Sequence, residues 1–426
     1  MHFPAIAKIL LVFFGVLFLH RLRLPLGPAL IGGGVLLDIW GGSALLTVMS
    51  HLGRACLLPE LWLLVLNISL IMEVGHFMAA RENSQAVIAA ARRWGGKHGL
   101  AVSLMMIPAV IGMVPMPGGA LFSAPLIGRT VEKSSSISPA WKTAVNYWFR
   151  HILEFWWPLY PVVIVTLSIF TIQTWKFMLL MIPFTFVSLA TGYFFLLRGR
   201  VTALTDSTDD DAERASLFVV MRPVFIIVIC TLLLPGLIQH ILPGASPAAW
   251  KLLAMLIGLV TGLGIIFVRQ AETARRPFAA LFTRKTFNIL MTLGGVMVFQ
   301  AMLESSNLLP VAGQELLASR VPFAIIIGLL PFLAGLVTGI AIGFAGAAFP
   351  IVAGFVAAAP DLQPMAALVL AFSMGYAGMM LSPVHLCLVL TKEYFSAPFI
   401  SVYRYILPCV VTVMAAGVFF YFLLSQ

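Results

Sequence analysis

The sequence predicts an all-α, polytopic membrane protein made of two inverted repeats, with about 10 transmembrane helices and two re-entrant helical hairpins. The first reason is composition: 61% of the 426 residues are hydrophobic and only 10% are charged, where soluble domains carry about 25% charged residues. The second is that apolar runs of about 20 residues recur along the chain, each long enough to cross a hydrocarbon core about 30 Å thick. The third is that landmarks of the first half return in the second.

The net charge of +10 comes from Lys and Arg at the ends of the apolar runs, which is typical of cytoplasmic loops. We therefore expect no nucleic-acid partner. Residues 5–19 are interpreted as a retained span, because no small-residue cleavage site follows them. The cysteines lack metal-ligand spacing and are interpreted as small apolar residues. They are Cys56, Cys230, Cys387 and Cys409.

The two halves of the chain match when "PGGALFSAPLIG" is laid over "IGFAGAAFPIVA", so that Gly118 falls on Gly343. The same shift places Pro158 on Pro383. A coincidence of Gly and Pro is the alternative, but the shared shift favours a true repeat. The predicted units are a first repeat over 1–198, a polar and acidic cytoplasmic linker over 199–221, and a second repeat over 222–426. The opening spans near 3–19, 25–48 and 57–80 have counterparts near 224–242, 249–269 and 286–303.

The distribution of Lys and Arg sets the orientation. With the N-terminus outside, most basic residues fall in inside loops, and Arg54, Lys176, Lys251 and Arg320 are left outside. The first repeat then starts outside and the second starts inside, as in many secondary transporters. This predicts a multi-pass protein of the prokaryotic cytoplasmic (inner) membrane with both termini outside.

The opposite orientation of the two repeats requires two segments that each enter and leave the membrane on the same side. These segments are residues 99–128 and 322–359. Both are apolar and interrupted by Gly and Pro, and the backbone groups freed there survive only inside protein or beside a wet cavity. We expect two helical hairpins, with tips at Gly118–Gly119 and near Gly343–Gly346. Close helix packing is the alternative for glycines at small-xxx-small spacing, such as Gly335, Gly339 and Gly343.

Each hairpin is followed by a span with proline in its middle, predicted over 142–174 and 364–391. Proline disfavours helix in the residue before it and suits the first turn of a new helix, as at Pro158 or Pro161. Four half-helix ends, two from hairpins and two from broken spans, would then meet near the membrane midplane. Helix N-termini there suit an anion, because they carry partial positive charge and unpaired N–H groups.

The segment "YWFRHILEFWWPLYPVV", residues 147–163, holds ionisable side chains in a very apolar part of the chain. A charge near a bilayer centre costs about 2.5–3.5 kcal/mol on insertion scales. Arg150 and Glu154 lie four residues apart, and one interpretation is an internal ion pair. In the other, Arg150 binds a substrate carboxylate or phosphate, and Glu154 carries a coupling proton because burial favours its neutral form.

Other polar residues also have two interpretations. His151 and His385 either contact substrate or pack in the wall of the substrate cavity. Glu73 and His76 either carry protons or pair with each other near the membrane interface. Asn146 either bridges helices or contacts the ligand. Candidate substrate-binding residues are Pro117, Gly118, Gly119, Ser123, Asn146, Arg150, His151, Trp157, Gly343, Gly346, Ser382 and His385. Candidate proton-coupling residues are Glu154, Glu73 and His76. His151 and Glu154 are three apart, but one such pair lacks the further ligands of a metal site, so neither a metal nor a cofactor is expected.

The glycine-rich hairpin together with "NYWFRHILEFWWPLYP" and "SPVHLCLVLTKEYF" resembles an uncharacterised family of prokaryotic integral membrane proteins. That family is grouped with the ion transporter superfamily, which includes gluconate, citrate and dicarboxylate permeases. The resemblance implies a scaffold with a transport unit, elevator-like motion and often a homodimer. Sodium-coupled dicarboxylate members carry Ser-Asn-Thr at the hairpin tips. This chain has "PGGALFSAP" and "GFAGAAFP" there, so we expect H⁺ rather than Na⁺ as the coupling ion.

The leading functional hypothesis is a secondary active transporter of a small organic anion, either a carboxylate or a sugar acid, with proton coupling. A translocase for a phosphate-bearing lipid carrier is the alternative, since the same half-helix ends would hold a phosphate. No enzyme activity is expected, because the spans contain no His-Glu-x-x-His, no Gly-x-Ser-x-Gly and no paired aspartates. A passive channel is disfavoured, because pinched hairpins suit alternating access better than an open pore.

Overall fold

The computed structural model describes residues 3–79, 99–113, 119–131, 137–200, 217–269, 283–319, 321–359 and 362–426. Every regular element in these ranges is helical, which confirms the predicted all-α class. Among the described residues, seven helices are long and apolar enough to cross a membrane. They cover Pro59–Phe77, Thr174–Leu197, Met221–Ile241, Pro247–Val268, Thr286–Ser305, Ala341–Ala358 and Phe399–Leu424. Shorter apolar helices accompany them, so the chain is a polytopic membrane protein.

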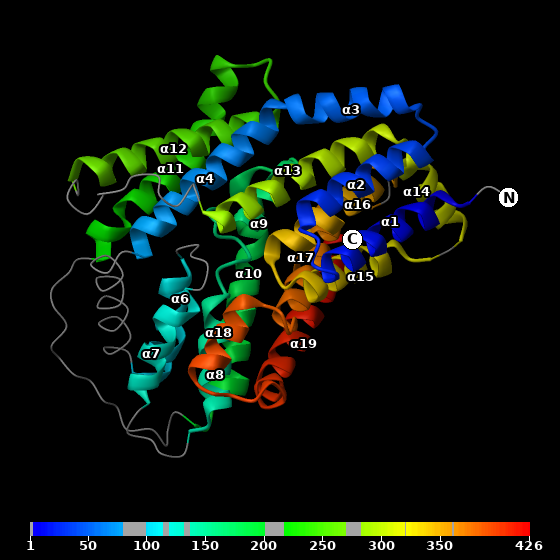
Figure 1. Ribbon diagram of the computed structural model, residues 1–426. Coiled ribbons are helices and arrows are strands. Elements are labelled where there is room, and N and C mark those ends of the chain that lie inside the picture. The colour runs from blue at the N-terminus through cyan, green and yellow to red at the C-terminus, as the bar shows by residue number, and fades with distance from the viewer. Residues whose placement is uncertain are drawn as a thin grey trace.

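One group of helices, here called the scaffold group, comes from the beginning of both halves of the chain. Its members are α1 (Ala5–Arg21), α2 (Leu26–Trp40), α3 (Leu45–Leu57), α4 (Pro59–Ala79), α11 (Leu217–Ile241), α12 (Pro247–Arg269), α13 (Arg284–Ser305) and α14 (Leu308–Ala318). Helix α2 packs on α13, and α12 packs on both α11 and α4 (Figure 1). A Cβ atom added at Gly27 of α2 would collide with the backbone of Met291, so glycine is what lets α2 and α13 approach so closely.

The second helix is shorter than the span predicted over 25–48, because this stretch forms two helices instead of one. Helix α2 ends at Trp40 and α3 begins at Leu45, with Gly42 between them at φ +100°. The buried carboxylate of Asp38 accepts hydrogen bonds from Ser43 Oγ (2.7 Å) and His51 Nδ1 (2.8 Å). These two bonds fix the turn between α2 and α3.

The remaining helices form the hairpin group. They are α6 (Leu100–Gly112), α7 (Ala120–Thr130), α8 (Pro139–Arg150), α9 (Pro161–Ile169), α10 (Thr174–Gly192), the π-helix η1 (Tyr193–Leu197), α15 (Phe323–Thr338), α16 (Ala341–Ala358), α17 (Pro364–Met380), α18 (Leu386–Tyr394) and α19 (Phe399–Leu424). Helices α6 and α7 pack on α8, and α17 lies between α15 and α19 (Figure 1). Helix α16 touches both groups, since it contacts α9 and α17 of the hairpin group and α13 and α14 of the scaffold group.

The two hairpins are α6 with α7 and α15 with α16. The connection of the first runs through 113–119, of which 114–118 lie outside the described residues. The second turns at Gly339 and Ile340, a few residues before the predicted tip at Gly343–Gly346. Gly339 has φ +64°, a backbone conformation that glycine adopts readily, and this places the turn there. Gly335 serves packing instead, because its α-carbon faces the backbone of Gly375 in α17.

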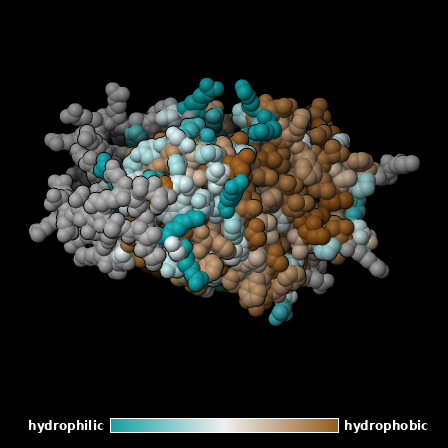
Figure 2. Space-filling view, turned by 90° about the horizontal axis from the view of Figure 1, so that it is seen from below, coloured by the Kyte–Doolittle hydropathy of each residue, from teal (hydrophilic) through white to brown (hydrophobic). Residues whose placement is uncertain are grey.

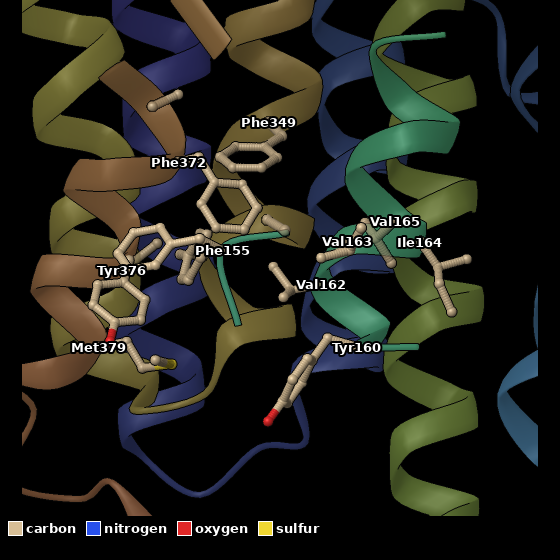
Figure 3. Packing of buried hydrophobic residues seen from close by; sticks show 14 of the residues in the cluster. Phe155, Tyr160, Val162, Val163, Ile164, Val165, Phe349, Phe372, Tyr376 and Met379 are labelled. Carbon is tan, nitrogen blue, oxygen red and sulfur yellow. The ribbon is translucent and has the colours of Figure 1, made fainter. Parts of the chain in front are cut away.

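Both proline-containing spans are broken. The first stops as α8 at Arg150 and resumes as α9 at Pro161, and the second stops as α17 at Met380 and resumes as α18 at Leu386. Phe155 in the first break packs against Tyr376 of α17 with ring centroids 4.1 Å apart, and it stacks on Phe184 of α10 at 5.3 Å. Figure 3 shows Phe155 beside Tyr376 and Phe372 in this aromatic cluster. The break is therefore held by buried aromatic contacts.

The molecular surface is strongly apolar. Figure 2 shows hydrophobic side chains gathered over a broad part of one face. Large apolar residues are exposed on α10, α11 and α19, including Phe186, Leu233, Phe419 and Phe422. A surface of this kind suits a lipid environment, in which apolar side chains need no cover.

Candidate functional site

Arg150 joins the first break to the first hairpin. It is the last residue of α8, and only 4% of it is exposed. Its guanidinium lies over the α-carbon of Gly119, because a Cβ atom added there would sit 2.8 Å from Cζ and 2.9 Å from Nη1. Its carbonyl oxygen faces Gly112, whose own carbonyl accepts a hydrogen bond from the Tyr160 hydroxyl. The end of α6 and the beginning of α7 therefore both rest on this break.

The second hairpin rests on the second break in a related way. A Cβ atom added at Gly339 would lie 2.9 Å from both the backbone nitrogen of His385 and Oγ of Ser382. The Ser382 Oγ also accepts a hydrogen bond from the backbone N–H of Val384 at 3.4 Å. The turn of the hairpin is thus seated on the residues that lead into α18.

The two breaks meet through a pair of buried histidines. His151 Nε2 and His385 Nε2 are 3.2 Å apart, although the residues are separated by 234 positions in sequence. The ring of Tyr147 packs edge-on against both imidazoles, with centroids 4.9 Å and 5.2 Å away. Its hydroxyl donates to the carbonyl of Met380 at the end of α17 (3.2 Å). Both halves of the chain therefore contribute to one polar centre.

Asn146 ties three helices together beside this centre. Its Nδ2 donates to the carbonyl of Ala120 at the start of α7 (3.1 Å) and to Oγ1 of Thr391 on α18 (3.2 Å). Its Oδ1 is buried and accepts no hydrogen bond from any described residue. Asn146 thus bridges helices through its Nδ2, and its Oδ1 remains as an acceptor that makes no hydrogen bond with the described residues.

Glu154 and Cys387 complete the polar set. Glu154 Oε1 lies 3.9 Å from His151 Nε2, so this carboxyl group faces the imidazole of a histidine. Cys387 brings its sulfur near His151 and His385, with the ligand atoms of the three residues within 4.8 Å of one another. Sequence reasoning missed Cys387, which was interpreted as a small apolar residue. Its position two residues after His385, inside a predicted break, was the available signal.

Four half-helices begin around these breaks and hairpin turns, at Ala120, Pro161, Ala341 and Leu386. None of the four has a side-chain hydrogen bond at its N-cap. The first N–H groups of a helix lack partners within the helix and carry partial positive charge. These helix beginnings and the Arg150 guanidinium are the positive groups of this region, and Glu154 is its acidic group.

The remaining predicted site residues differ in where they lie and in what they contact. Ser123 is buried on α7 and donates to the Ala120 carbonyl, and Trp157 is buried with its Nε1 unbonded within the described residues. Gly343 faces the Thr338 side chain of its own hairpin, and Gly346 faces Val296 of α13. These two glycines therefore serve close packing in this conformation. Pro117 and Gly118 lie outside the described residues.

Glu73 and His76 lie on α4, which packs on α12 and α13 in the scaffold group. Glu73 is buried and His76 is exposed. Asn67 on the same helix donates to the carbonyl of Leu252 on α12 (3.0 Å), so it bridges these two helices. In the described part of the chain these three residues belong to the scaffold group, whereas Arg150 belongs to the hairpin group.

The fold and the site define a polytopic helical membrane protein with two hairpins seated on two broken helices. Residues 60–424 match the family described as "Protein of unknown function (DUF401)", and the chain belongs to that family. Of the solved structures, 12 chains match. One is the YdaH transporter of Alcanivorax borkumensis, described as having an unusual topology, with a TM-score of 0.57 and 15% identity over 88% of this chain and 86% of that chain. This likeness shows the fold, and the curated proteins gave no match.

Proposed function

We propose that the protein is a secondary active transporter of a small organic anion, either a carboxylate or a sugar acid. The observation that carries the proposal is the buried Arg150, held where the ends of the first hairpin meet the first break. A guanidinium offers a planar fork of N–H donors that matches a carboxylate. The transporter named among the structural neighbours adds support through its fold.

The surroundings of Arg150 suit an anion in a second way. The uncapped beginnings of α7 and α9 offer backbone N–H groups, and Pro161 at the start of α9 removes only a donor that would lack a partner in any case. Asn146 Nδ2 is already engaged, so its contribution is to hold α7 and α18 in place. The anion would thus be held by one cation and by helix ends rather than by a dense cage.

We propose H⁺ as the coupling ion. Each negative charge that enters a cell with a negative interior costs about 2.3 kcal/mol per 100 mV, so accumulation of an anion requires a compensating cation. This requirement holds whichever side chain carries the proton. The hairpin sequences of this chain, which lack Ser-Asn-Thr, favour a proton over Na⁺.

We propose that the hairpin group moves against the scaffold group as an elevator, in the cytoplasmic membrane of a prokaryote, with both termini outside and as a homodimer. The division of helices into two groups supports this mechanism, as does the position of α16 between them. Lys251 of α12 crosses the boundary, since its Nζ donates to the carbonyls of Leu167 and Ile172 (2.8 Å each). Contacts of this kind would have to break and re-form during each cycle.

A translocase for a phosphate-bearing lipid carrier is the second candidate. An apolar groove on the hairpin group favours it, because such a groove could hold an acyl or prenyl chain. The groove runs along α15, α17 and α19 and is lined by Gly328, Phe332, Leu370, Met374, Met414 and Phe422, among others. The headgroup would need the same cationic centre.

Reconstituted protein separates the two candidates. Proteoliposomes are tested for uptake of gluconate, citrate and succinate, with and without an inward proton gradient, and the purified protein is examined for bound lipid by mass spectrometry. Saturable uptake of one anion that rises with the proton gradient supports the transporter. Absence of flux for all three, together with a stoichiometric phosphate-bearing lipid, would favour the translocase.

A further inference from the structure

We propose that His151, His385, Cys387 and Glu154 form a binding site for a borderline-soft divalent transition-metal ion such as Zn²⁺. This goes beyond anion transport, and its test needs no transported substrate. The three residues His151, His385 and Cys387 are buried or half-buried, and their ligand atoms lie within 4.8 Å of one another. They come from the two halves of the chain, from the break after α8 and from the beginning of α18.

The spacing of the two imidazoles fits a metal ion. The Nε2 atoms of His151 and His385 are 3.2 Å apart. If a metal ion lay about 2.05 Å from each nitrogen, the nitrogen–metal–nitrogen angle would be roughly 100°, near the tetrahedral value of about 109°. The two rings are also tilted by 77°, so they do not stack.

The tautomer of His151 is the one that a metal ligand needs. Its Nδ1 lies 2.6 Å from the backbone carbonyl of Tyr147 and therefore carries the proton. This leaves the lone pair of Nε2 directed at His385. Metal-binding histidines almost always donate their other N–H to a carbonyl or carboxylate in this manner.

Cys387 and Glu154 supply the remaining donors. In a tetrahedral site a zinc-bound sulfur lies roughly 3.6 Å from a zinc-bound nitrogen, and the ligand atoms of Cys387, His151 and His385 already lie within 4.8 Å of one another. Glu154 Oε1 is already 3.9 Å from His151 Nε2. Histidine nitrogen, cysteine sulfur and carboxylate oxygen are each ligands that Zn²⁺ accepts, and tetrahedral zinc takes four of them.

Charge and ligand type decide which ion fits. A thiolate and a carboxylate together carry two negative charges, which balance the charge of a divalent cation. Mg²⁺ and Ca²⁺ prefer oxygen ligands throughout, whereas thiolate and imidazole favour Zn²⁺ and its neighbours in the first transition row. A bound ion would join the end of α8 to the beginning of α18 and hold the two breaks together.

The test uses the full-length protein in detergent, freed of metal by a chelator and titrated with Co²⁺. We expect one Co²⁺ per chain with the near-ultraviolet charge-transfer band of a thiolate ligand, and displacement of that band by Zn²⁺. X-ray absorption of the zinc-loaded wild-type protein should show one sulfur among nitrogen and oxygen neighbours. A wild-type protein that gives no thiolate band and no sulfur neighbour overturns the proposal.

Variants identify the ligands. Cys387→Ser should lose the charge-transfer band, and His385→Gln should weaken Co²⁺ binding at least about tenfold. Cys409→Ser is the matched control, because Cys409 is a buried cysteine on α19 outside the proposed ligand set, and it should bind Co²⁺ as the wild type does. A band that survives in Cys387→Ser, or disappears in Cys409→Ser, contradicts the assignment. Because no transport is measured, these results are independent of the proposed function.

Discussion

The guanidinium group of Arg150 and the α-carbon of Gly119 are in contact, so that any side chain at position 119 would occupy the place of the guanidinium. Gly119 has an ordinary right-handed backbone conformation, φ −55°, which alanine also adopts. The crowding at this position therefore concerns the end of a flexible side chain and leaves the backbone unstrained.

We predict that Gly119→Ala folds but displaces the Arg150 guanidinium. The affinity for the anion that binds best among gluconate, citrate and succinate should fall at least about tenfold, or about 1.4 kcal/mol. Isothermal titration calorimetry on the purified protein measures it. Gly32→Ala is the control, since a Cβ atom there meets no atom within 4 Å, and it should bind the anion normally. Equal affinities for both variants would contradict the proposed anion site.

The second prediction concerns the bridge made by Asn146 between α7, α8 and α18. Asn146→Ala removes the two hydrogen bonds that its Nδ2 donates, to the Ala120 carbonyl and to Oγ1 of Thr391, and should lower the free energy of unfolding by about 1–3 kcal/mol. Thr391→Val removes the other partner. Because the two residues share a hydrogen bond, the double variant should lose less than the sum of the single losses. Denaturant unfolding followed by tryptophan fluorescence measures all three, and strictly additive losses would argue against the bridge.

The third prediction concerns Gly346, which the sequence placed at the substrate. In the structure a Cβ atom at Gly346 would collide with Cγ2 of Val296 on α13. Gly346→Ala should therefore lower the melting temperature, and adding Val296→Ala should restore most of it by making room. If Val296→Ala gives no recovery, packing between α16 and α13 is not the role of Gly346.

The fourth prediction concerns Lys251, whose charged Nζ holds two carbonyls near the end of α9. Lys251→Met keeps the length of the side chain and removes its donors, so it should cost about 1.5–3 kcal/mol of stability. If this contact breaks in every cycle, transport by the variant should also become faster. Lys176→Met, at an exposed lysine on α10, should change neither quantity.

Much of the fold was predictable from the sequence, because bilayer thickness and helix geometry fix the length of an apolar span. Proline was a partial guide to the breaks, since helices also continue through Pro183 and Pro408. The breaks after Arg150 and before Leu386 follow from Pro158, Pro161 and Pro383. The stretch 25–48 was predicted wrongly as one span, because hydropathy does not register the Asp38–Ser43–His51 hydrogen bonds that end α2 and start α3.

The candidate site was predictable only in part. Arg150, His151 and His385 could be chosen as candidates because an ionisable side chain in an apolar membrane segment is costly and usually has a function. Which residues meet across the two halves could not be read from the sequence, since contacts between residues 234 positions apart depend on how the halves pack. For the same reason Cys387 was missed, and Gly346 was assigned to substrate although it faces Val296.

The most direct test of the central claim is the affinity of Arg150→Ala for the transported anion, beside Arg404→Ala, whose side chain is exposed on α19. Loss of a buried charged partner typically costs 2–5 kcal/mol, so we predict a decrease of at least about 30-fold for Arg150→Ala in both binding and proteoliposome uptake. Arg150→Lys, which keeps the charge but not the fork, should fall between the wild type and Arg150→Ala. Wild-type affinity and uptake in a folded Arg150→Ala protein would contradict the account.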